Sequence, residues 1–175
     1  MKVQIENAGE FCRRLEALNP AIVSARHFED NRLLDFADRS LGAGHSLLRI
    51  RSAAGRHYLT FKGPPRPEGI FKIREELETC VEDADVLFQV FERIGMRVSF
   101  RYQKYRREFS WGDVHIAVDE TPVGDYVEFE GSEAAIRDVA QRLGVEEAQF
   151  LRSSYYSLYV EYCRAHGKAP EFMVF

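Results

Sequence analysis

Six segments of this sequence alternate charged and apolar residues, and the charged side chains are of the types that bind phosphate or metal ions. Successive residues of a β-strand point to opposite faces, so the charges of each segment would share one face. The six sets are Arg49/Arg51, Thr60/Lys62, Lys72/Arg74/Glu76/Glu78, Lys104/Arg106/Glu108, His115/Ala117/Asp119 and Glu128/Glu130. Arginine and lysine bind phosphate oxygens, and clustered carboxylates bind hard divalent cations such as Mg²⁺ or Mn²⁺. The pattern predicts a site for a polyanion and a divalent cation.

The opposite face of the same segments is apolar. Its residues are Leu48, Ile50, Leu59, Phe61, Phe71, Ile73, Leu77, Tyr105, Phe109, Val114, Ile116, Val118, Val127 and Phe129. If this face were exposed it would form a very large hydrophobic surface, so helices must cover it. We therefore expect an α+β fold in which an antiparallel sheet, closed or nearly closed into a barrel, has a charged interior and peripheral helices.

Turn residues and hydrophobic periodicity place the individual elements. Strands are predicted near residues 1–6, 22–28, 31–36, 46–54, 57–63, 69–81, 97–110, 113–120 and 125–131. Helices are predicted from Ala8 to Leu18, from Asp83 to Gly95, from Ser132 to Leu143 and from about Glu146 to Ala165. Asn7, Asp83 and Ser132 are the expected N-caps of the first three helices.

Length and composition limit the class of protein. A chain of 175 residues is expected to form one domain, over residues 1–175. Its 24 basic and 28 acidic residues give a net charge of −4, which argues against a general nucleic-acid binder. Cys12, Cys80 and Cys163 form no C-x-x-C pair, which disfavours disulfides and thiolate metal sites and fits a reducing cytoplasm. No segment resembles a membrane span or a leader peptide, so we expect a soluble cytoplasmic protein without membrane partners.

Several short motifs resemble those of a known family. They are Leu47-Leu48-Arg49-Ile50-Arg51, Leu59-Thr60-Phe61-Lys62-Gly63-Pro64, Arg74-Glu75-Glu76-Leu77-Glu78, Tyr102-Gln103-Lys104-Tyr105-Arg106, Arg152-Ser153-Ser154-Tyr155-Tyr156 and the segment from Asp119 to Gly131. Together, and in this order, they resemble the CYTH superfamily of triphosphate tunnel metalloenzymes. The resemblance runs over nearly the whole chain. It implies an eight-stranded antiparallel barrel around a hydrophilic tunnel, which agrees with the expected polarity of the sheet.

The resemblance also implies roles for individual residues. The triphosphate would be held by Lys2, Arg49, Arg51, Lys62, Lys104 and Arg106. The metal-proximal acids would be Asp119, Glu128 and Glu130, with Mg²⁺ or Mn²⁺ as the cofactor. Glu76 and Glu78 match carboxylates of less sharply defined role, and we group them with Lys104 and Arg106 as candidate catalytic residues.

The N-terminus departs from the family pattern. The family signature begins with Glu-x-Glu-x-Lys on the first strand, whereas this sequence begins Met1-Lys2-Val3-Gln4-Ile5-Glu6. Lys2 occupies the place of the motif's lysine. One hypothesis is that the native protein begins several residues earlier, or that two metal-site carboxylates have been lost. The alternative is that Gln4 and Glu6 are a degenerate form of the pair.

Three functions are compatible with these residues. The first is a class IV type adenylyl cyclase that converts ATP to cyclic AMP and pyrophosphate. The second is an inorganic or organic triphosphatase acting on tripolyphosphate or thiamine triphosphate. The third, from another class, is a non-catalytic binder of nucleotides or polyphosphate. A homodimer is expected only because members of the family often pair.

Some charged and aromatic residues have simpler interpretations. Lys72, Arg74 and Glu108 are interpreted as members of cross-strand ion pairs. His115 shares a strand face with Asp119 but is left out of the site. The C-terminal tyrosines at 155, 156, 159 and 162 are interpreted as helix packing residues rather than as a platform for base stacking.

Overall fold

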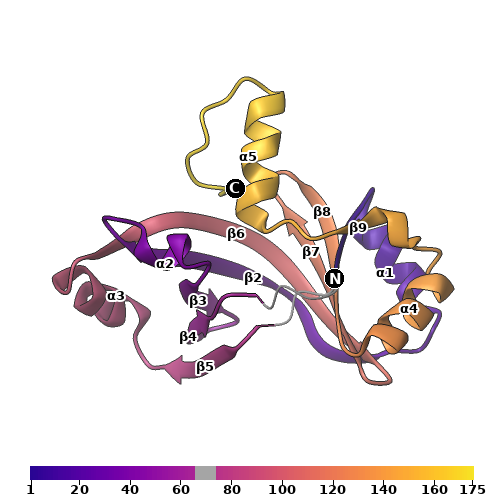
Figure 1. Cartoon of the computed structure of the whole chain (residues 1–175). Helices are drawn as coiled ribbons and strands as arrows, with labels where there is room; N and C mark the ends of the chain where they lie inside the picture. The colour runs from indigo at the N-terminus through magenta and orange to yellow at the C-terminus, as the bar shows by residue number, and fades with distance from the viewer. Residues whose placement is uncertain (66–73) are drawn as a thin grey trace.

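The computed structural model describes residues 1–65 and 74–175 and arranges them around one β-sheet (Figure 1). Within these residues the sheet has nine strands in the order β5-β4-β3-β2-β6-β7-β8-β1-β9. The strands are β1 (Lys2–Ile5), β2 (Ala21–Phe36), β3 (Leu47–Ala53), β4 (Arg56–Lys62), β5 (Glu76–Val81), β6 (Met96–Trp111), β7 (Val114–Thr121), β8 (Gly124–Glu130) and β9 (Phe150–Leu151). Neighbouring strands are antiparallel throughout, as expected. Among the described residues β5 and β9 are separate edges, so the closed eight-stranded barrel is not confirmed.

The two long strands β2 and β6 pair through the middle of the sheet and connect its two halves (Figure 1). One half contains β3, β4 and β5, and the other contains β7, β8, β1 and β9. The β2/β6 register shifts near Ser24 and again between Leu33 and Leu34, and such bulges bend and twist a strand. The separate strands predicted near 22–28 and 31–36 form one strand, because Glu29 and Asp30 continue the pairing with β6 instead of turning. Of the strand predicted near 69–81, residues 69–73 lie outside the described part of the chain.

The described residues form five α-helices. They are α1 (Ala8–Glu16), α2 (Ser40–Ala43), α3 (Ala84–Arg93), α4 (Glu133–Arg142) and α5 (Tyr155–Ala165). The three predicted N-caps are confirmed, because the side chains of Asn7, Asp83 and Ser132 accept hydrogen bonds from backbone N–H groups of the first turn. The short helix α2 was not predicted from the sequence.

The fourth predicted helix, from about Glu146 to Ala165, is wrong in its first half. Residues Glu147–Gln149 form a short 3₁₀ helix, and the following β9 pairs with Lys2 and Val3 of β1. This pairing supplies hydrogen-bond partners for backbone groups of β1. A helix in the same place would leave those groups without a partner. The helix α5 begins only at Tyr155, where the side chain of Ser154 accepts a hydrogen bond from the N–H of Ser157 at 3.1 Å.

Two hydrophobic clusters cover the apolar face of the sheet, one on each half. On one half, Phe11 and Leu15 of α1 and Ile136 and Val139 of α4 belong to one cluster with the outward residues of β7 and β8. On the other half, Leu87, Phe88 and Phe91 of α3 pack with Ile50, Leu48 and Leu59. The predicted covering of this face by helices is confirmed there, although Leu77 on the edge strand β5 remains 59% exposed.

The helix α5 lies on the other face of the sheet, near the junction of the two halves (Figure 1). Its first residue, Tyr155, is buried in a third cluster with Phe100 and Tyr102 of β6 and Tyr126 of β8. Phe100, Tyr102, Lys104 and Arg106 alternate along β6 and therefore share this face. Helix α5 thus packs beside the charged surface that the sequence pattern predicted.

Candidate functional site

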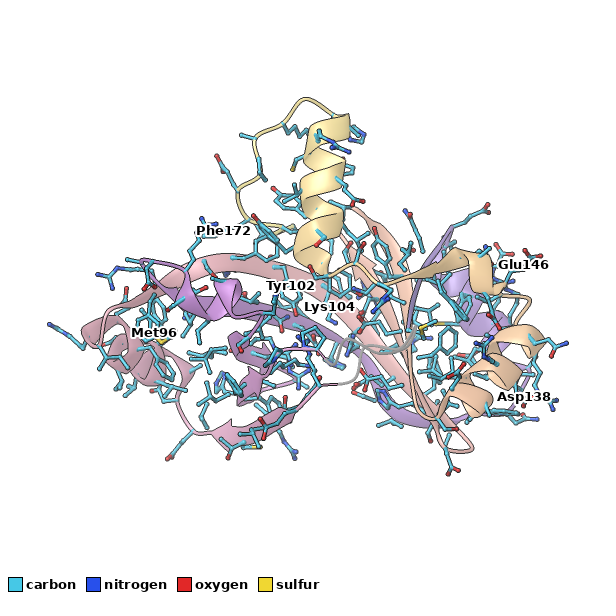
Figure 2. All side chains as sticks on the ribbon, viewed as in Figure 1. Met96, Tyr102, Lys104, Asp138, Glu146 and Phe172 are labelled. Carbon is cyan, nitrogen blue, oxygen red and sulfur yellow. The ribbon has the colours of Figure 1, made fainter. Side chains whose placement is uncertain are left out.

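A fully buried carboxylate, Asp119 of β7, lies at the centre of the charged face. Arg106 donates to it twice, from Nε to Oδ1 and from Nη2 to Oδ2, each at 2.7 Å. Lys104 Nζ lies 3.0 Å from Oδ2, and the Tyr155 hydroxyl donates to the same oxygen at 2.5 Å. Strand β6 and the distant helix α5 therefore position one carboxylate on β7, whose two oxygens are both engaged (Lys104 is labelled in Figure 2).

Glu128 of β8 extends this cluster towards the N-terminus. Its Oε2 lies 2.5 Å from Arg106 Nη2, and its Oε1 lies 3.3 Å from Lys2 Nζ. The Lys2 ammonium also lies 3.5 Å from the centroid of the Tyr155 ring, close enough for a cation–π interaction. Burial raises the pKa of the Glu128 carboxyl, but the charges of Lys2 and Arg106 outweigh it and hold that pKa well below its ordinary value. Glu128 is therefore an anion at neutral pH.

A second buried carboxylate, Glu29 of β2, connects the two halves of the charged face. Only 2% of Glu29 is exposed, and its oxygens lie 3.4 Å from Lys104 Nζ and 3.6 Å from Arg51 Nη1. Burial acts to raise the pKa of Glu29, yet the surrounding cations, with Lys104 and Arg106 contributing most, lower it well below the ordinary value of 4.5. Glu29 thus holds cations of β3 and β6 close to each other.

The remaining predicted cations lie on β3 and β4, opposite carboxylates of the edge strand β5. Glu78 lies 3.2 Å from Arg51 Nη2 and 3.6 Å from Arg49 Nη2, and it accepts a hydrogen bond from the Thr60 hydroxyl at 2.7 Å. Lys62 Nζ lies 2.7 Å from Glu76 Oε2. Glu76 and Glu78 are partly exposed, so their ion pairs are more accessible to solvent than those of Asp119.

The structure therefore places all six predicted phosphate-binding cations on one face. Lys2 comes from β1, Arg49 and Arg51 from β3, Lys62 from β4, and Lys104 and Arg106 from β6. Each of them lies within 4 Å of a carboxylate. A polyanion that enters this face can replace the carboxylates as the partner of these cations, which are already charged before it binds.

Two neighbouring lysines respond differently to burial. Burial lowers the pKa of both ammonium groups. For Lys2 the effect of burial exceeds that of the nearby carboxylates, so its pKa lies below the ordinary value. For Lys104 burial is outweighed by the carboxylates of Asp119 and Glu29 on either side, so its pKa is raised. Lys104 therefore remains a fixed cation, and Lys2 is the more easily deprotonated of the two.

A comparison of the sequence with protein-family models matches the CYTH domain over residues 6–155. The chain belongs to the CYTH domain family. The match covers the strands that carry all the site residues except Lys2, which precedes it.

Curated relatives of this CYTH chain carry cyclase names. Adenylate cyclase CyaB from Aeromonas hydrophila is 27% identical over 174 residues, covering 90% of this chain and 85% of the relative. A protein of Methanocaldococcus jannaschii, provisionally named an adenylate cyclase, is 25% identical over 169 residues, covering 90% of this chain and 95% of the relative.

Solved structures show the same fold. A Pyrococcus horikoshii protein superposes with a TM-score of 0.77 at 24% identity, covering 91% of this chain and 96% of the other. The Hippeastrum protein HpAC1, described as revealing a dominant triphosphatase activity, has a TM-score of 0.68 at 17% identity, covering 97% of this chain and 96% of the other. In the described residues of the present chain, no helix has both the length and the apolarity needed to span a bilayer.

The acids of this CYTH chain differ in how well they suit a divalent cation. Residues 1–65 and 74–175 contain no group of three or more His, Cys, Asp or Glu side chains arranged around a metal position. Asp119 has both oxygens engaged, whereas Glu130 is exposed and has no ion pair among the described residues. Glu128 and Glu130 alternate on β8 and share the charged face. Carboxylate oxygens of this kind are the donors that Mg²⁺ or Mn²⁺ prefers, and of the two acids Glu130 is the open one, since both oxygens of Glu128 lie near Arg106 and Lys2.

Sequence reasoning missed Glu29 and Tyr155 as members of the site. Glu29 falls where a break between two strands was predicted, although the alternation of His27, Glu29 and Asn31 continues through it. Tyr155 was interpreted as a helix packing residue, and its place beside Asp119 and Lys2 depends on how α5 docks. Glu108 was interpreted as an ion-pair residue, and its Oε1 lies 3.4 Å from His115 Nε2.

Proposed function

We propose that this CYTH protein is a metal-dependent enzyme that acts on a triphosphate bound on its charged face, most specifically an adenylyl cyclase that forms cyclic AMP and pyrophosphate from ATP. One observation carries the proposal: six cations from four strands converge on a single face, beside carboxylates that could hold a divalent cation. The family membership and the cyclase names of the curated relatives support the same class of substrate.

The cations would bind and orient the phosphates. Arg106 has a fixed orientation because its guanidinium is bound to both Asp119 and Glu128, and Lys104 is held between Asp119 and Glu29. Fixed cations of this kind stabilise negative charge that develops on the transferring phosphorus and the leaving oxygen, since they need no rearrangement during the reaction. In this proposal Asp119 positions Arg106 and Lys104 and is not itself a metal ligand.

Glu128 and Glu130 would hold Mg²⁺ or Mn²⁺ together with phosphate oxygens of the substrate. When bound, the ion supplies Lewis-acid neutralisation of phosphate charge. In the cyclase reaction, a ribose hydroxyl attacks the α-phosphorus and pyrophosphate leaves. The cations would bend the bound triphosphate across the sheet. Arg49 and Arg51 lie on one half of the sheet, Lys2 lies on the other half, and Arg106 lies on the central strand β6.

A triphosphatase is the second candidate. The same cations would then hold tripolyphosphate or an organic triphosphate while water attacks the terminal phosphorus. Its support is the dominant triphosphatase activity for which HpAC1 was described, since that protein has the same fold.

A single assay separates these candidates. The purified protein is incubated with Mg²⁺ or Mn²⁺ and with ATP, tripolyphosphate or thiamine triphosphate, and the products are analysed for cyclic AMP, pyrophosphate and orthophosphate. Cyclic AMP with pyrophosphate supports the cyclase, and orthophosphate supports the triphosphatase. Binding of triphosphates without any product would support a non-catalytic binder, and no binding at all would contradict the proposal.

The assay has a matched control within one strand. Arg106→Gln removes a cation of the charged face, whereas Arg107→Gln removes its neighbour, which points to the other face and lies 3.6 Å from Glu16. Arg106→Gln should abolish turnover, whereas Arg107→Gln should leave it nearly unchanged, because Arg107 lies on the other face and its exposed ion pair contributes little to stability.

A further inference from the structure

Asn31 of β2 is a fully buried amide that has no hydrogen-bond partner in the part of the chain that the structure describes. It is 0% exposed, and neither its Oδ1 nor its Nδ2 bonds to any of the described residues. A side-chain amide carries two N–H donors and two acceptor lone pairs, and leaving them unsatisfied inside a protein is destabilising. A polar group retained under this cost calls for a partner that the described residues do not supply.

The position of Asn31 points to that partner. On β2 it lies two residues after Glu29 and two before Leu33, and all three share one face of the strand. Glu29 belongs to the ion-pair cluster, whereas Leu33 packs against the aromatic cluster of Phe100, Tyr102, Tyr126 and Tyr155. Asn31 therefore lies at the boundary between the cations and the aromatic rings.

The cross-strand neighbours of Asn31 belong to the two sides of this boundary. It pairs with Arg51 of β3 on one side and with Tyr102 of β6 on the other. The Tyr102 hydroxyl in turn accepts a hydrogen bond from Arg49 Nη1 at 3.4 Å. The Nε atoms of Arg49 and Arg51 are themselves buried and without hydrogen-bond partners among the described residues. The two cross-strand neighbours of Asn31 are thus an arginine of the cation cluster and a tyrosine of the aromatic cluster.

We propose that Asn31 and Tyr102 bind the organic part of an organic triphosphate, such as the nucleoside of ATP, next to the phosphates held by Arg49 and Arg51. This inference rests on the proposed function and narrows its substrate to organic triphosphates. Phosphate oxygens only accept hydrogen bonds, so they would satisfy Nδ2 and leave Oδ1 unpaired. A hydroxyl or amino group of a nucleoside can satisfy Oδ1 as well, and asparagine pairs in this two-sided way with adenine edges. The Tyr102 ring already packs against Phe100 and Tyr155, so Tyr102 would contribute its hydroxyl, which Arg49 contacts, to the polar side of this subsite.

Entry of the ligand follows from the same contacts. Arg49 and Arg51 are held by Glu78 and Glu29, and these are the pairs that a bound phosphate exchanges. The exchange would free the side chain of Arg51, the cross-strand neighbour of Asn31 on β3. In this proposal the amide is reached only after the phosphates bind, and it discriminates between substrates once the charged end has docked.

The test compares the binding of two ligands to Asn31→Leu, a change that keeps the size of the side chain and removes its polar atoms. Dissociation constants are measured by calorimetry for a non-hydrolysable ATP analogue and for tripolyphosphate, and melting temperatures are recorded. We expect the dissociation constant for the ATP analogue to rise at least tenfold, that for tripolyphosphate to stay within twofold, and the melting temperature to stay equal or to rise.

Gln103→Leu is the matched control. Gln103 is also an amide on a central strand, but it points to the other face, where its Nε2 lies 3.4 Å from Asp30 and its Oε1 accepts from the N–H of Phe175 at 3.2 Å. This control should leave both dissociation constants unchanged. If Asn31→Leu fails to fold, Asn31→Ser replaces it, with tripolyphosphate again as the internal reference.

Each other outcome overturns the inference. Equal weakening of both ligands would make Asn31 a phosphate ligand, and unchanged binding with a lowered melting temperature would make its role structural. A wild-type protein that binds tripolyphosphate but not the ATP analogue would refute this inference while the triphosphatase function survives. A wild-type protein that binds neither ligand would refute the proposed function itself.

Discussion

Arg106 and Asp119 form a two-bond ion pair that is closed off from solvent, with 9% of the arginine side chain and none of the aspartate side chain exposed. The pair joins β6 to β7, whose Cα register sets these two residues directly opposite each other. Because Asp119 also accepts from Lys104 and Tyr155, one carboxylate holds three donors of the charged face in place.

Replacement of this carboxylate should be strongly destabilising. Asp119→Asn removes the charge that compensates Arg106 and Lys104, and breaking a buried pair in this way costs about 3–5 kcal/mol. Urea unfolding should show a lower midpoint with an unchanged slope. Glu133→Gln on α4 is the control, since it breaks only an exposed pair with Arg137 and should cost less than about 1 kcal/mol. An Asp119→Asn protein as stable as this control would refute the stabilising role of the Asp119 ion pairs.

Glu29 should make the protein sensitive to acid. Its pKa in the folded protein is lower than its ordinary value of 4.5, so the folded state binds the proton less readily than the unfolded state does. The stabilisation from Glu29 is therefore fully present above pH 4.5 and is lost progressively as the pH falls below it. Glu29→Gln should flatten the dependence of unfolding free energy on pH in this acidic range. An identical pH slope in wild type and variant would contradict the assignment.

Loss of a phosphate-binding cation should weaken ligand binding more than it weakens the fold. Arg51→Gln removes a partner of Glu78 and Glu29, and we expect the dissociation constant for tripolyphosphate to rise about tenfold or more, since charge-assisted bonds to phosphate are strong. Arg107→Gln serves as the control of equal charge change. If both variants weaken binding equally, the effect is one of net charge and not of the site.

Glu130 should be required for turnover but not for binding of the polyanion. Glu130 has no ion pair among the described residues, so Glu130→Ala breaks no described ion pair. The melting temperature should therefore stay nearly unchanged. If Glu130 holds the divalent cation, turnover with Mg²⁺ should be abolished while tripolyphosphate binding without metal persists. Unchanged turnover would remove Glu130 from the site.

Much of the charged face could be predicted from the sequence because it depends on a local rule. Residues two apart on a strand share a face, so the pairs Arg49/Arg51, Lys104/Arg106 and Glu128/Glu130 could be placed without knowledge of the fold. The same rule predicted that the apolar faces are covered by helices, as the packing of α1, α3 and α4 confirms.

The tertiary structure decided which of these charges meet. The register between strands sets Asp119 against Arg106, the uninterrupted course of β2 through Glu29 and Asn31 brings both onto the charged face, and the docking of α5 brings Tyr155 to Asp119. These contacts join residues far apart along the chain, and their geometry depends on the packing of the whole sheet, which local periodicity does not encode. The alternation of charged and apolar residues thus determined by itself that one face would be ionic, and the tertiary contacts decided which ion pairs form and which amide lacks a partner among the described residues.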